Sequence, residues 1–214
     1  MLKYSRIFKY LFSLNKYPMY LEYFLINIFF LKIWKFKGVD IGKGIIWWGI
    51  PIVNQFKGSK ISIGEKCVIC SRSDQTALGV NHKVIIRTLR ANSLLQIGNE
   101  VRLSGTTICA ADKIIIGNRC VLGANVTIVD TDFHSIDPKI RSSPEDDKSA
   151  IHKPVIIEDD VFVGVGTYIL KGVTIGKGSI IGAGSVVTKN IPNFTIVAGN
   201  PSKIIGKVNL KEIN

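Results

Sequence analysis

The chain has 214 residues, of which 28 are Lys or Arg and 16 are Asp or Glu, so its formal net charge is +12. This length allows one sizeable core with a small appended segment, and the charge predicts an anionic partner such as phosphate or acidic lipid. No nucleic-acid recognition motif appears and most of the charge lies in one terminal segment, so a nucleic-acid binder is disfavoured. Four cysteines are too few for a disulfide framework at this length, and the single CxxC pair at 67–70 fits small core residues better than a metal site.

The first segment, 1–60, differs in composition from the rest of the chain. It holds ten Lys or Arg, two acids and 15 of the 19 aromatic residues. Residues 3–16 alternate between an apolar and a basic face at helical spacing, Pro18 is expected to end that helix, and 20–36 continues as a second, more apolar segment. We expect a basic aromatic helical segment that leads into the first units of the fold, with a boundary near residue 60.

Two interpretations of helix 3–16 remain open: it lies in a membrane interface, or it caps one end of the fold. No signal peptide is evident, and the apolar run 23–31 is too short to span a bilayer. The predicted location is therefore the cytoplasm, with a possible association at the inner face of the cell membrane.

Two runs within residues 61–200 carry an aliphatic residue at every sixth position; the earlier one is Ile116, Leu122 and Ile128. The clearest run is Ile157, Val163, Ile169, Ile175, Ile181 and Val187, and glycine follows several of its members. A period of six fits neither a helix nor a long strand; it fits a solenoid in which each hexad forms one flat side of a triangular coil and a small residue turns the corner. Three hexads make a coil of about 18 residues. An all-β solenoid is therefore predicted.

The hexads, the interruption at DTDFH and the ending VVTKNIPNFTIVAGNPSKII resemble the hexapeptide-repeat acyltransferases over about residues 61–208. Within that family the chain is most similar to bacterial O-acetyltransferases of sugars and surface polysaccharides. The resemblance implies a left-handed parallel β-helix, a homotrimer, and acetyl-CoA as donor bound between neighbouring subunits. Asn200 followed by Pro201 further suggests a helix start, so a short C-terminal helix is expected over 201–206 in the tail 201–214.

The hexad pattern stops over 133–152, which reads as an excursion loop held by the rigid solenoid. The resemblance implies that His134 is the catalytic base. An imidazole can take the proton from a sugar hydroxyl as it attacks a thioester. Asp130 or Asp132 is expected to orient the ring, and the sequence does not choose between them. The alternative to a catalytic role is that His134 is an exposed loop residue without a function in the reaction.

An asparagine pair of the maltose and galactoside acetyltransferases has no counterpart in 103–106 of this chain, which reads LSGT. This departure favours an acceptor in a polysaccharide, glycolipid or precursor over a small free sugar. His82 and Arg87 are candidate acceptor-binding residues, against a simple surface or capping role.

The resemblance also implies a donor site in the last coils. Small residues there would let the backbone run close to the pantetheine arm, and basic residues would meet the adenine and phosphate end, against the alternative of a solvated face. The candidates are Gly164, Val165, Gly166, Ala183, Thr188, Lys189, Lys203 and Lys207.

Three other functions remain in view. An amino-sugar N-acetyltransferase is a close variant of the same chemistry. A zinc-dependent lyase of the carbonic-anhydrase kind uses the same solenoid, and His134 and His152 are one coil length apart, but the sequence between them is not a coil. A non-catalytic membrane-associated scaffold is the third.

Overall fold

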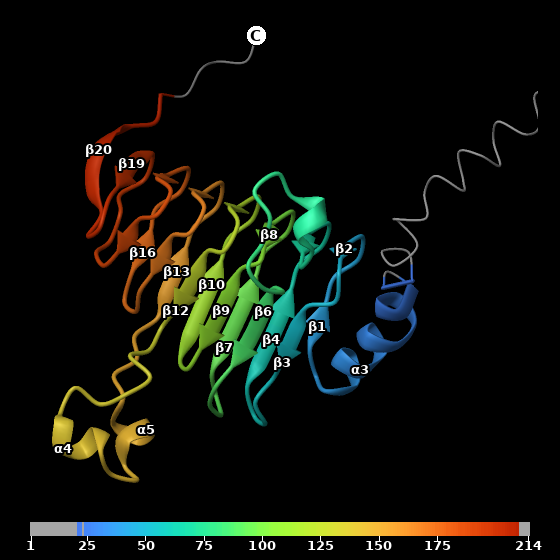
Figure 1. The fold of residues 1–214 in the computed structure, drawn as a ribbon, viewed down its shortest axis with the longest axis horizontal. Helices are drawn as coiled ribbons and strands as arrows, with labels where there is room; N and C mark the ends of the chain where they lie inside the picture. Colours follow the sequence, from blue (N-terminus) through green and yellow to red (C-terminus); the bar gives the residue numbers. More distant parts are fainter. Residues whose placement is uncertain (1–20, 23, 210–214) are drawn as a thin grey trace, which may run out of the picture.

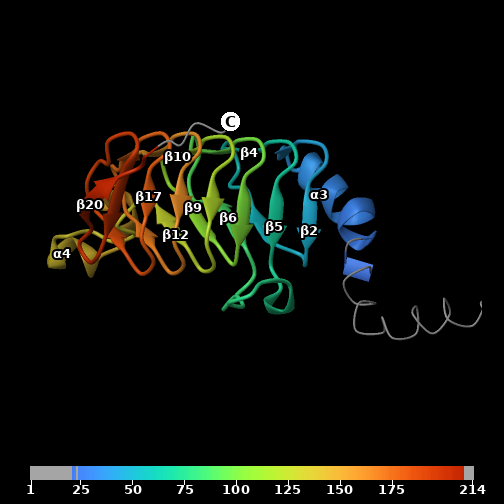
Figure 2. The same ribbon diagram turned by 90° about the horizontal axis from the view of Figure 1, so that it is seen from above.

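The computed structural model describes residues 21–22 and 24–209. The strands form three parallel sheets that wind into a β-helix, and each coil contributes one strand to each sheet (Figures 1 and 2). The left-handed parallel β-helix expected from the sequence is confirmed. The predicted helix 3–16 lies outside the described residues.

The three sheets are named A, B and C in the order in which the chain meets them. Sheet A contains β1 Asp40–Ile41, β4 Lys60–Ile63, β7 Leu94–Ile97, β10 Lys113–Ile116, β13 Val155–Ile157 and β16 Thr174–Ile175. Sheet B contains β2 Ile46–Trp48, β5 Val68–Cys70, β8 Arg102–Ser104, β11 Val121–Leu122, β14 Phe162–Val163, β17 Ile180–Ile181, β19 Thr195–Ala198 and β20 Lys203–Lys207. Sheet C contains β3 Ile52–Asn54, β6 Ile85–Thr88, β9 Thr107–Ala110, β12 Thr127–Val129, β15 Tyr168–Ile169 and β18 Val186–Val187.

The residues of the sequence period point into the solenoid and stack on one another. In sheet A, Ile63, Ile97, Ile116, Ile157 and Ile175 are in register from coil to coil, and each is at most 2% exposed. Each isoleucine thus packs on the same residue type in the coils before and after it. Full burial of such a side chain contributes about 1.5–3 kcal/mol, so these stacks stabilise the fold.

All four cysteines are buried, as the sequence predicted. Cys67 and Cys120 occupy inward positions in the core, and their thiols donate to carbonyl oxygens of adjacent coils. Burial raises the pKa of the Cys120 thiol to about 11. A thiol with a raised pKa is a poor nucleophile and a poor metal ligand, which fits the packing role.

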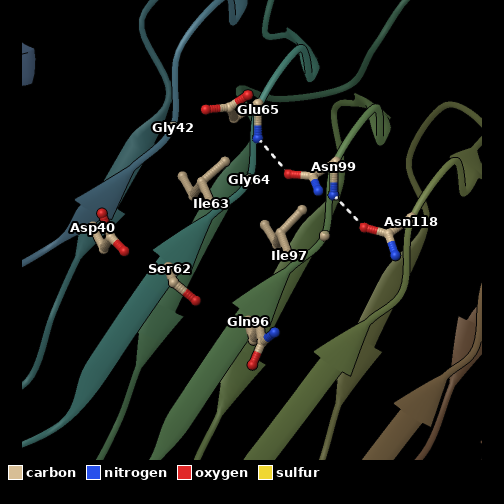
Figure 3. Close-up of a pocket in the computed structure, with 11 residues that line it drawn as sticks. Asp40, Gly42, Ser62, Ile63, Gly64, Glu65, Gln96, Ile97, Asn99 and Asn118 are labelled. Carbon is tan, nitrogen blue, oxygen red and sulfur yellow. Dashed lines mark hydrogen bonds between the residues drawn. The ribbon is translucent and has the colours of Figure 1, made fainter.

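A ladder of side chains joins the coils at the corner between sheets A and B (Figure 3). The Oδ1 atom of Asn99 accepts from the backbone N–H of Glu65 at 2.8 Å, and Asn118 Oδ1 accepts from Asn99 N at 2.9 Å. Asp159 Oδ1 continues the ladder by accepting from Asn118 N at 2.7 Å. Each of these side chains satisfies a backbone donor of the preceding coil, which would otherwise be left without a partner at the turn.

The first coil begins at Asp40, so the composition change near residue 60 does not mark the start of the solenoid. Trp47 of β2 is 1% exposed and pairs in register with Ile69. The helix before this coil contains residues 21–22 and 24–25, the wider turns of η2 Ile26–Phe30, and α3 Leu31–Phe36. Its Trp34 ring lies 5.6 Å from the ring of Trp47, so part of the aromatic residues of the segment cap the open end of the core.

The predicted C-terminal helix over 201–206 is wrong. Residues 203–207 form β20, which pairs antiparallel with β19 and is the last strand of sheet B. The unpaired backbone groups of β19 accept a returning strand, with Ala198 opposite Lys203. These ladder hydrogen bonds outweigh the helix-start signal of the Asn-Pro pair, which is weak without a longer helical sequence behind it.

Candidate active site

The excursion after β12 leaves the solenoid through a narrow neck. Asp132 N donates to Ile151 O at 3.0 Å and Lys153 N donates to Asp130 O at 2.8 Å, so the two ends of the loop lie side by side. Between them the loop folds into two short helices, α4 Pro138–Arg141 and α5 Asp146–Ser149. The loop projects from the corner between sheets C and A (Figure 1). β12 ends at Val129 and β13 begins at Val155, so the loop occupies the interval in which the hexad pattern stops.

The neck and the helices position His134 against an acid from the far side of the loop. The Nδ1 atom of His134 lies 2.6 Å from Asp146 Oδ2, and the other oxygen of Asp146 accepts from Ser135 N at 2.7 Å. The His134 side chain is 68% exposed, whereas that of Asp146 is 18% exposed. These two hydrogen bonds, first that from His134, hold the pKa of Asp146 below its usual value.

The contact with Asp146 also fixes the tautomer of the histidine. An ionised carboxylate can only accept, so the shared proton belongs to Nδ1, and Nε2 keeps its lone pair. The ring can thus receive a proton at Nε2 while the acid stabilises the positive charge that results. His134 and Asp146 have the arrangement of a general base with its orienting acid.

Neither acid expected to orient His134 does so. Both oxygens of Asp130 are buried and accept from backbone N–H groups, Ala111 N at 2.7 Å and Asp112 N at 2.8 Å. Burial is the larger effect on the Asp130 carboxyl and raises its pKa, against these hydrogen bonds. Asp130 therefore closes a coil corner, and its role as an orienting acid is wrong.

Asp132 was the other candidate, and it has a different partner. Its Oδ1 lies 2.6 Å from Nζ of Lys171 in the next coil, so the pair joins the neck of the loop to the solenoid. The assignment of Asp132 to the histidine is wrong as well. Asp146 was missed because it lies 12 residues beyond His134 in a cluster of three acids, and sequence alone does not say which of them folds back.

The loop is also tied to an earlier coil. The guanidinium of Arg90 donates to the carbonyl oxygen of Asp147 and lies 3.3 Å from its carboxylate. Arg90 follows the end of β6, two coils before the loop leaves the solenoid. The excursion therefore folds back along the corner between sheets C and A.

The two acceptor candidates lie at opposite ends of β6. Arg87 is on this strand close to the edge that the loop covers, and its Nε atom is buried without a hydrogen-bond partner among the described residues. His82 precedes the strand in a second excursion, 71–84, is exposed, and has its Nδ1 atom 2.8 Å from Lys83 O. Within one chain the structure therefore brings Arg87, but not His82, to the edge of sheet C from which the His134 loop leaves.

The small residues of the donor candidate set lie at one corner, between sheets B and C. Gly164 packs so closely on the next coil that an added Cβ would lie 2.5 Å from Ala183 N, so its small size is needed for coil stacking alone. Val165 and Gly166 are half-buried and Ala183 is exposed. Gly166 has a φ of +66° and open space where a side chain would point, and so has Gly184 in the next coil. This corner thus offers an exposed backbone that a ligand could approach.

The basic candidates are more dispersed. Lys203 is opposite Ala198, at the end of β19 near the glycine corner, whereas Lys207 is opposite Thr195 at the far end of the same pair. Thr188 and Lys189 follow β18 at the corner between sheets C and A and are exposed. Of the four, Lys203 is the one that the strand pairing places beside the glycine corner.

A polar groove on sheet A lies away from these residues (Figure 3). Asp40, Ser62 and Gln96 lie along its floor, and the amide oxygens of Asn99 and Asn118 at its edge are already bound to backbone donors. The two asparagines of this groove therefore serve the coil ladder. Within the part of the chain that the structure describes, no three His, Cys, Asp or Glu side chains gather as metal ligands.

The repeat of this solenoid matches a known family model. The model of the hexapeptide repeat of succinyl-transferase matches residues 113–130 and 154–189, and the gap between the two matches is the His134 excursion. The regular coils of the chain thus carry the hexapeptide repeat of this family model. The family match thus covers the regular coils β10–β18 and omits the loop that carries the candidate base.

Curated acetyltransferases match between about a quarter and a half of this chain. Galactoside O-acetyltransferase of Lactococcus lactis is 43% identical over 103 residues, which are 48% of this chain and 47% of that protein. The 2,3,4,5-tetrahydropyridine-2,6-dicarboxylate N-acetyltransferase of Halalkalibacterium halodurans is 56% identical over 59 residues, 28% of this chain and 25% of that protein. The chain spans about half the length, or less, of the curated relatives it matches.

A solved structure shares the fold over more of its length. A point mutant of AntD, an N-acyltransferase from Bacillus cereus, in complex with dTDP-4-amino-4,6-dideoxyglucose and coenzyme A, superposes with a TM-score of 0.55 at 17% identity. The match covers 84% of this chain and 90% of that one. At this identity the comparison supports the fold alone.

Proposed function

We propose that this protein is an acetyl-CoA-dependent O-acetyltransferase that acylates a sugar hydroxyl, with His134 as general base. The observation that carries the proposal is the hydrogen bond of 2.6 Å between His134 Nδ1 and Asp146 Oδ2, which leaves Nε2 free to accept a proton. The similarity to a galactoside O-acetyltransferase supports transfer to a sugar hydroxyl.

In this reaction His134 first accepts a proton from the acceptor hydroxyl and later donates it to the leaving sulfur. Nε2 of His134 takes the proton of the acceptor hydroxyl as its oxygen attacks the thioester carbonyl, and Asp146 stabilises the imidazolium. When the tetrahedral intermediate collapses, the C–S bond breaks and the imidazolium returns the proton to the leaving sulfur. The products are an acetyl ester and coenzyme A. General base catalysis of this kind contributes about 10²–10⁴-fold to the rate.

The proposal also assigns a donor site and an acceptor site. The exposed backbone at Gly166 and Gly184 leaves room for the pantetheine arm of acetyl-CoA, and Lys203 lies near that corner to meet its phosphates. Arg87 is a partly buried cation on β6 near the edge from which the His134 loop leaves, and its positive charge favours an acceptor with an acidic group. An acidic polysaccharide, a glycolipid or a precursor of either fits this requirement.

Release of free thiol from acetyl-CoA, measured across a panel of acceptors, tests the function. The panel contains free galactosides, acidic oligosaccharides, lipid-linked sugars and amino sugars, and the acylated product is identified by mass spectrometry. Acceptor-dependent release that His134→Gln abolishes supports the proposal. Acylation of an amine alone would identify the N-acetyltransferase alternative, which the similarity to an N-acetyltransferase also supports. No release with any acceptor would favour a non-catalytic scaffold.

The proposal includes a homotrimer located in the cytoplasm. The outward faces of the coils carry large apolar side chains, with Ile46, Phe162 and Tyr168 each 45–50% exposed in the single chain, as a subunit interface would require. Four free thiols fit a reducing compartment. The molar mass in solution, measured by light scattering, tests the trimer. Among the described residues no helix combines the length and apolarity needed to cross a bilayer.

A further inference from the structure

The helical segment before the first coil is apolar on two opposite sides. Ile26, Phe30 and Trp34 are four residues apart and face the solenoid, with Ile26 and Trp34 buried in the core. The side away from the solenoid is apolar too: Phe24 is 55% exposed and Phe29 is 54% exposed. Leu21 and Ile28 add to this side, and Figures 1 and 2 show the segment at the end of the solenoid, beyond the first coil. A helix that is apolar all round is normally covered all round.

Basic residues continue the outward side. Lys32 and Lys35 lie on the same side of the helix as Phe24 and Ile28, one turn or two further along, and both are exposed. Residues 1–39 contain seven Lys or Arg and a single acid, Glu22. The carboxylate of Glu22 lies 3.3 Å from the guanidinium of Arg72 in the excursion 71–84, so its charge is neutralised by the body of the protein. The outward side is thus positive as well as apolar.

This combination excludes the other obvious coverings. A second copy docked through the same surface would bring Lys32 and Lys35 against their own counterparts, and like charges in contact repel. Residues 1–20 hold four Lys or Arg and no acid, so their packing on this side would add positive charge to it. The covering surface must be apolar in its interior and negative where it meets the lysines.

We propose that the outward side of the helix before the first coil, which carries Phe24, Ile28, Phe29, Lys32 and Lys35, docks in the interface of an anionic lipid bilayer. The phenylalanine rings enter the boundary between head groups and acyl chains, and the two lysines contact anionic head groups. The same helix therefore has two roles, since its inner side caps the solenoid while its outer side binds the membrane. The proposal is independent of the acyl transfer, because it rests on the helix alone.

Co-sedimentation of the full chain with vesicles tests the proposal. Vesicles containing phosphatidylglycerol are compared with vesicles of phosphatidylcholine alone, at about 0.1 M and about 1 M salt, where the screening length falls from about 10 to about 3 Å. We expect binding to the anionic vesicles that weakens with salt. The double variant Lys32→Glu with Lys35→Glu should lower the partition coefficient about tenfold or more and flatten its salt dependence. Phe24→Ser with Phe29→Ser should lower binding while the salt dependence remains.

Matched controls change the same kinds of residue elsewhere. Lys139→Glu with Lys153→Glu removes two exposed lysines from the loop region, and Phe56→Ser with Leu78→Ser removes two apolar side chains that are 47% and 74% exposed. Both controls should bind vesicles as the wild type does. A thiol-reactive, environment-sensitive fluorophore attached to the cysteine of Phe36→Cys gives a second measurement, because Phe36 is 93% exposed while the four native thiols are buried. Its fluorescence emission should shift to shorter wavelength when anionic vesicles are added.

Three results would overturn the proposal: a wild-type chain that ignores anionic vesicles at low salt, helix variants that bind as well as the controls, or helix variants that change only the molar mass. The second result would assign binding to another segment, and the third would show that another copy of the chain covers the helix.

Discussion

The carboxylate of Asp146 is held between the His134 ring at 2.6 Å and the backbone N–H of Ser135 at 2.7 Å. One oxygen serves each donor, so the acid fixes both the ring and the backbone on which the ring is mounted. Asp146→Asn keeps the size of the side chain but puts an NH₂ group where one of the two acceptors was. We expect kcat to fall about 10–100-fold, less than in His134→Ala, while the thermal midpoint hardly changes.

Glu145→Gln is the control for this substitution. It removes an adjacent loop acid whose contact is with Lys148 rather than with the histidine, so kcat should stay near that of the wild type. Equal turnover of Asp146→Asn and the wild type would show that the ring is oriented by another group.

The contact between His134 and Asp146 also predicts how the pKa of Asp146 changes when the histidine is replaced. Because the hydrogen bond from His134 is the largest cause of the low pKa of Asp146, His134→Gln should raise that pKa toward the ordinary aspartate value. The contribution of the carboxylate to loop order is present above about pH 4 and is lost as the pH falls through its lowered pKa. Carbon-detected NMR of the Asp146 carboxyl group in both proteins measures the shift. An unchanged pKa in the variant would contradict the direct contact.

Asp130 should matter for folding. Both of its oxygens accept backbone hydrogen bonds at a buried corner, so Asp130→Asn leaves one N–H facing an amide NH₂ group. The free energy of unfolding should fall by about 1–3 kcal/mol. Urea denaturation measures the loss, and kcat of the protein that remains folded should be near normal. Asp132→Asn is the comparison; it breaks a half-exposed pair with Lys171 and should cost about 1 kcal/mol or less.

Gly166→Ala tests the donor corner. The added methyl group points into open space but forces alanine to a φ of +66°, which costs about 1–2 kcal/mol. If the pantetheine arm runs along this corner, the KM for acetyl-CoA should also rise. Gly44→Ala has a φ of +71° at a corner of the first coil, so it should lower stability similarly and leave KM unchanged. A KM that rises in neither variant would remove the donor from this corner.

Lys203 and Lys207 provide a pair on one strand. Lys203→Ala should raise the KM for acetyl-CoA more than it lowers kcat, since it contacts a remote part of the donor. Lys207→Ala, at the far end of β20, should have a smaller effect. Equal KM values for both variants and the wild type would show that these lysines are solvent-exposed residues that do not contact the donor.

The sequence predicted the solenoid well because each inward isoleucine has the same neighbours in the coils before and after it, so a local period carries the long-range packing. His134 could be singled out because it lies where that period is interrupted and matches the catalytic histidine that the family resemblance implies. Asp146 could not, since its approach to the ring depends on how two four-residue helices fold inside the loop. The C-terminal strand was missed for a similar reason: its partner β19 is a tertiary neighbour, and the local Asn-Pro signal pointed to a helix.

The narrow neck at Asp130–Asp132 and Ile151–Lys153 has a consequence for how such a protein can evolve. The chain leaves and re-enters the solenoid at almost one point, and Ile116 still pairs with Ile157 across the interruption. Exchange or lengthening of the segment between the two strands would cost little, because loop-closure entropy grows slowly with length. The loop between β12 and β13 could therefore be replaced during evolution, and with it the preference for an acceptor, while the coils on either side keep their register.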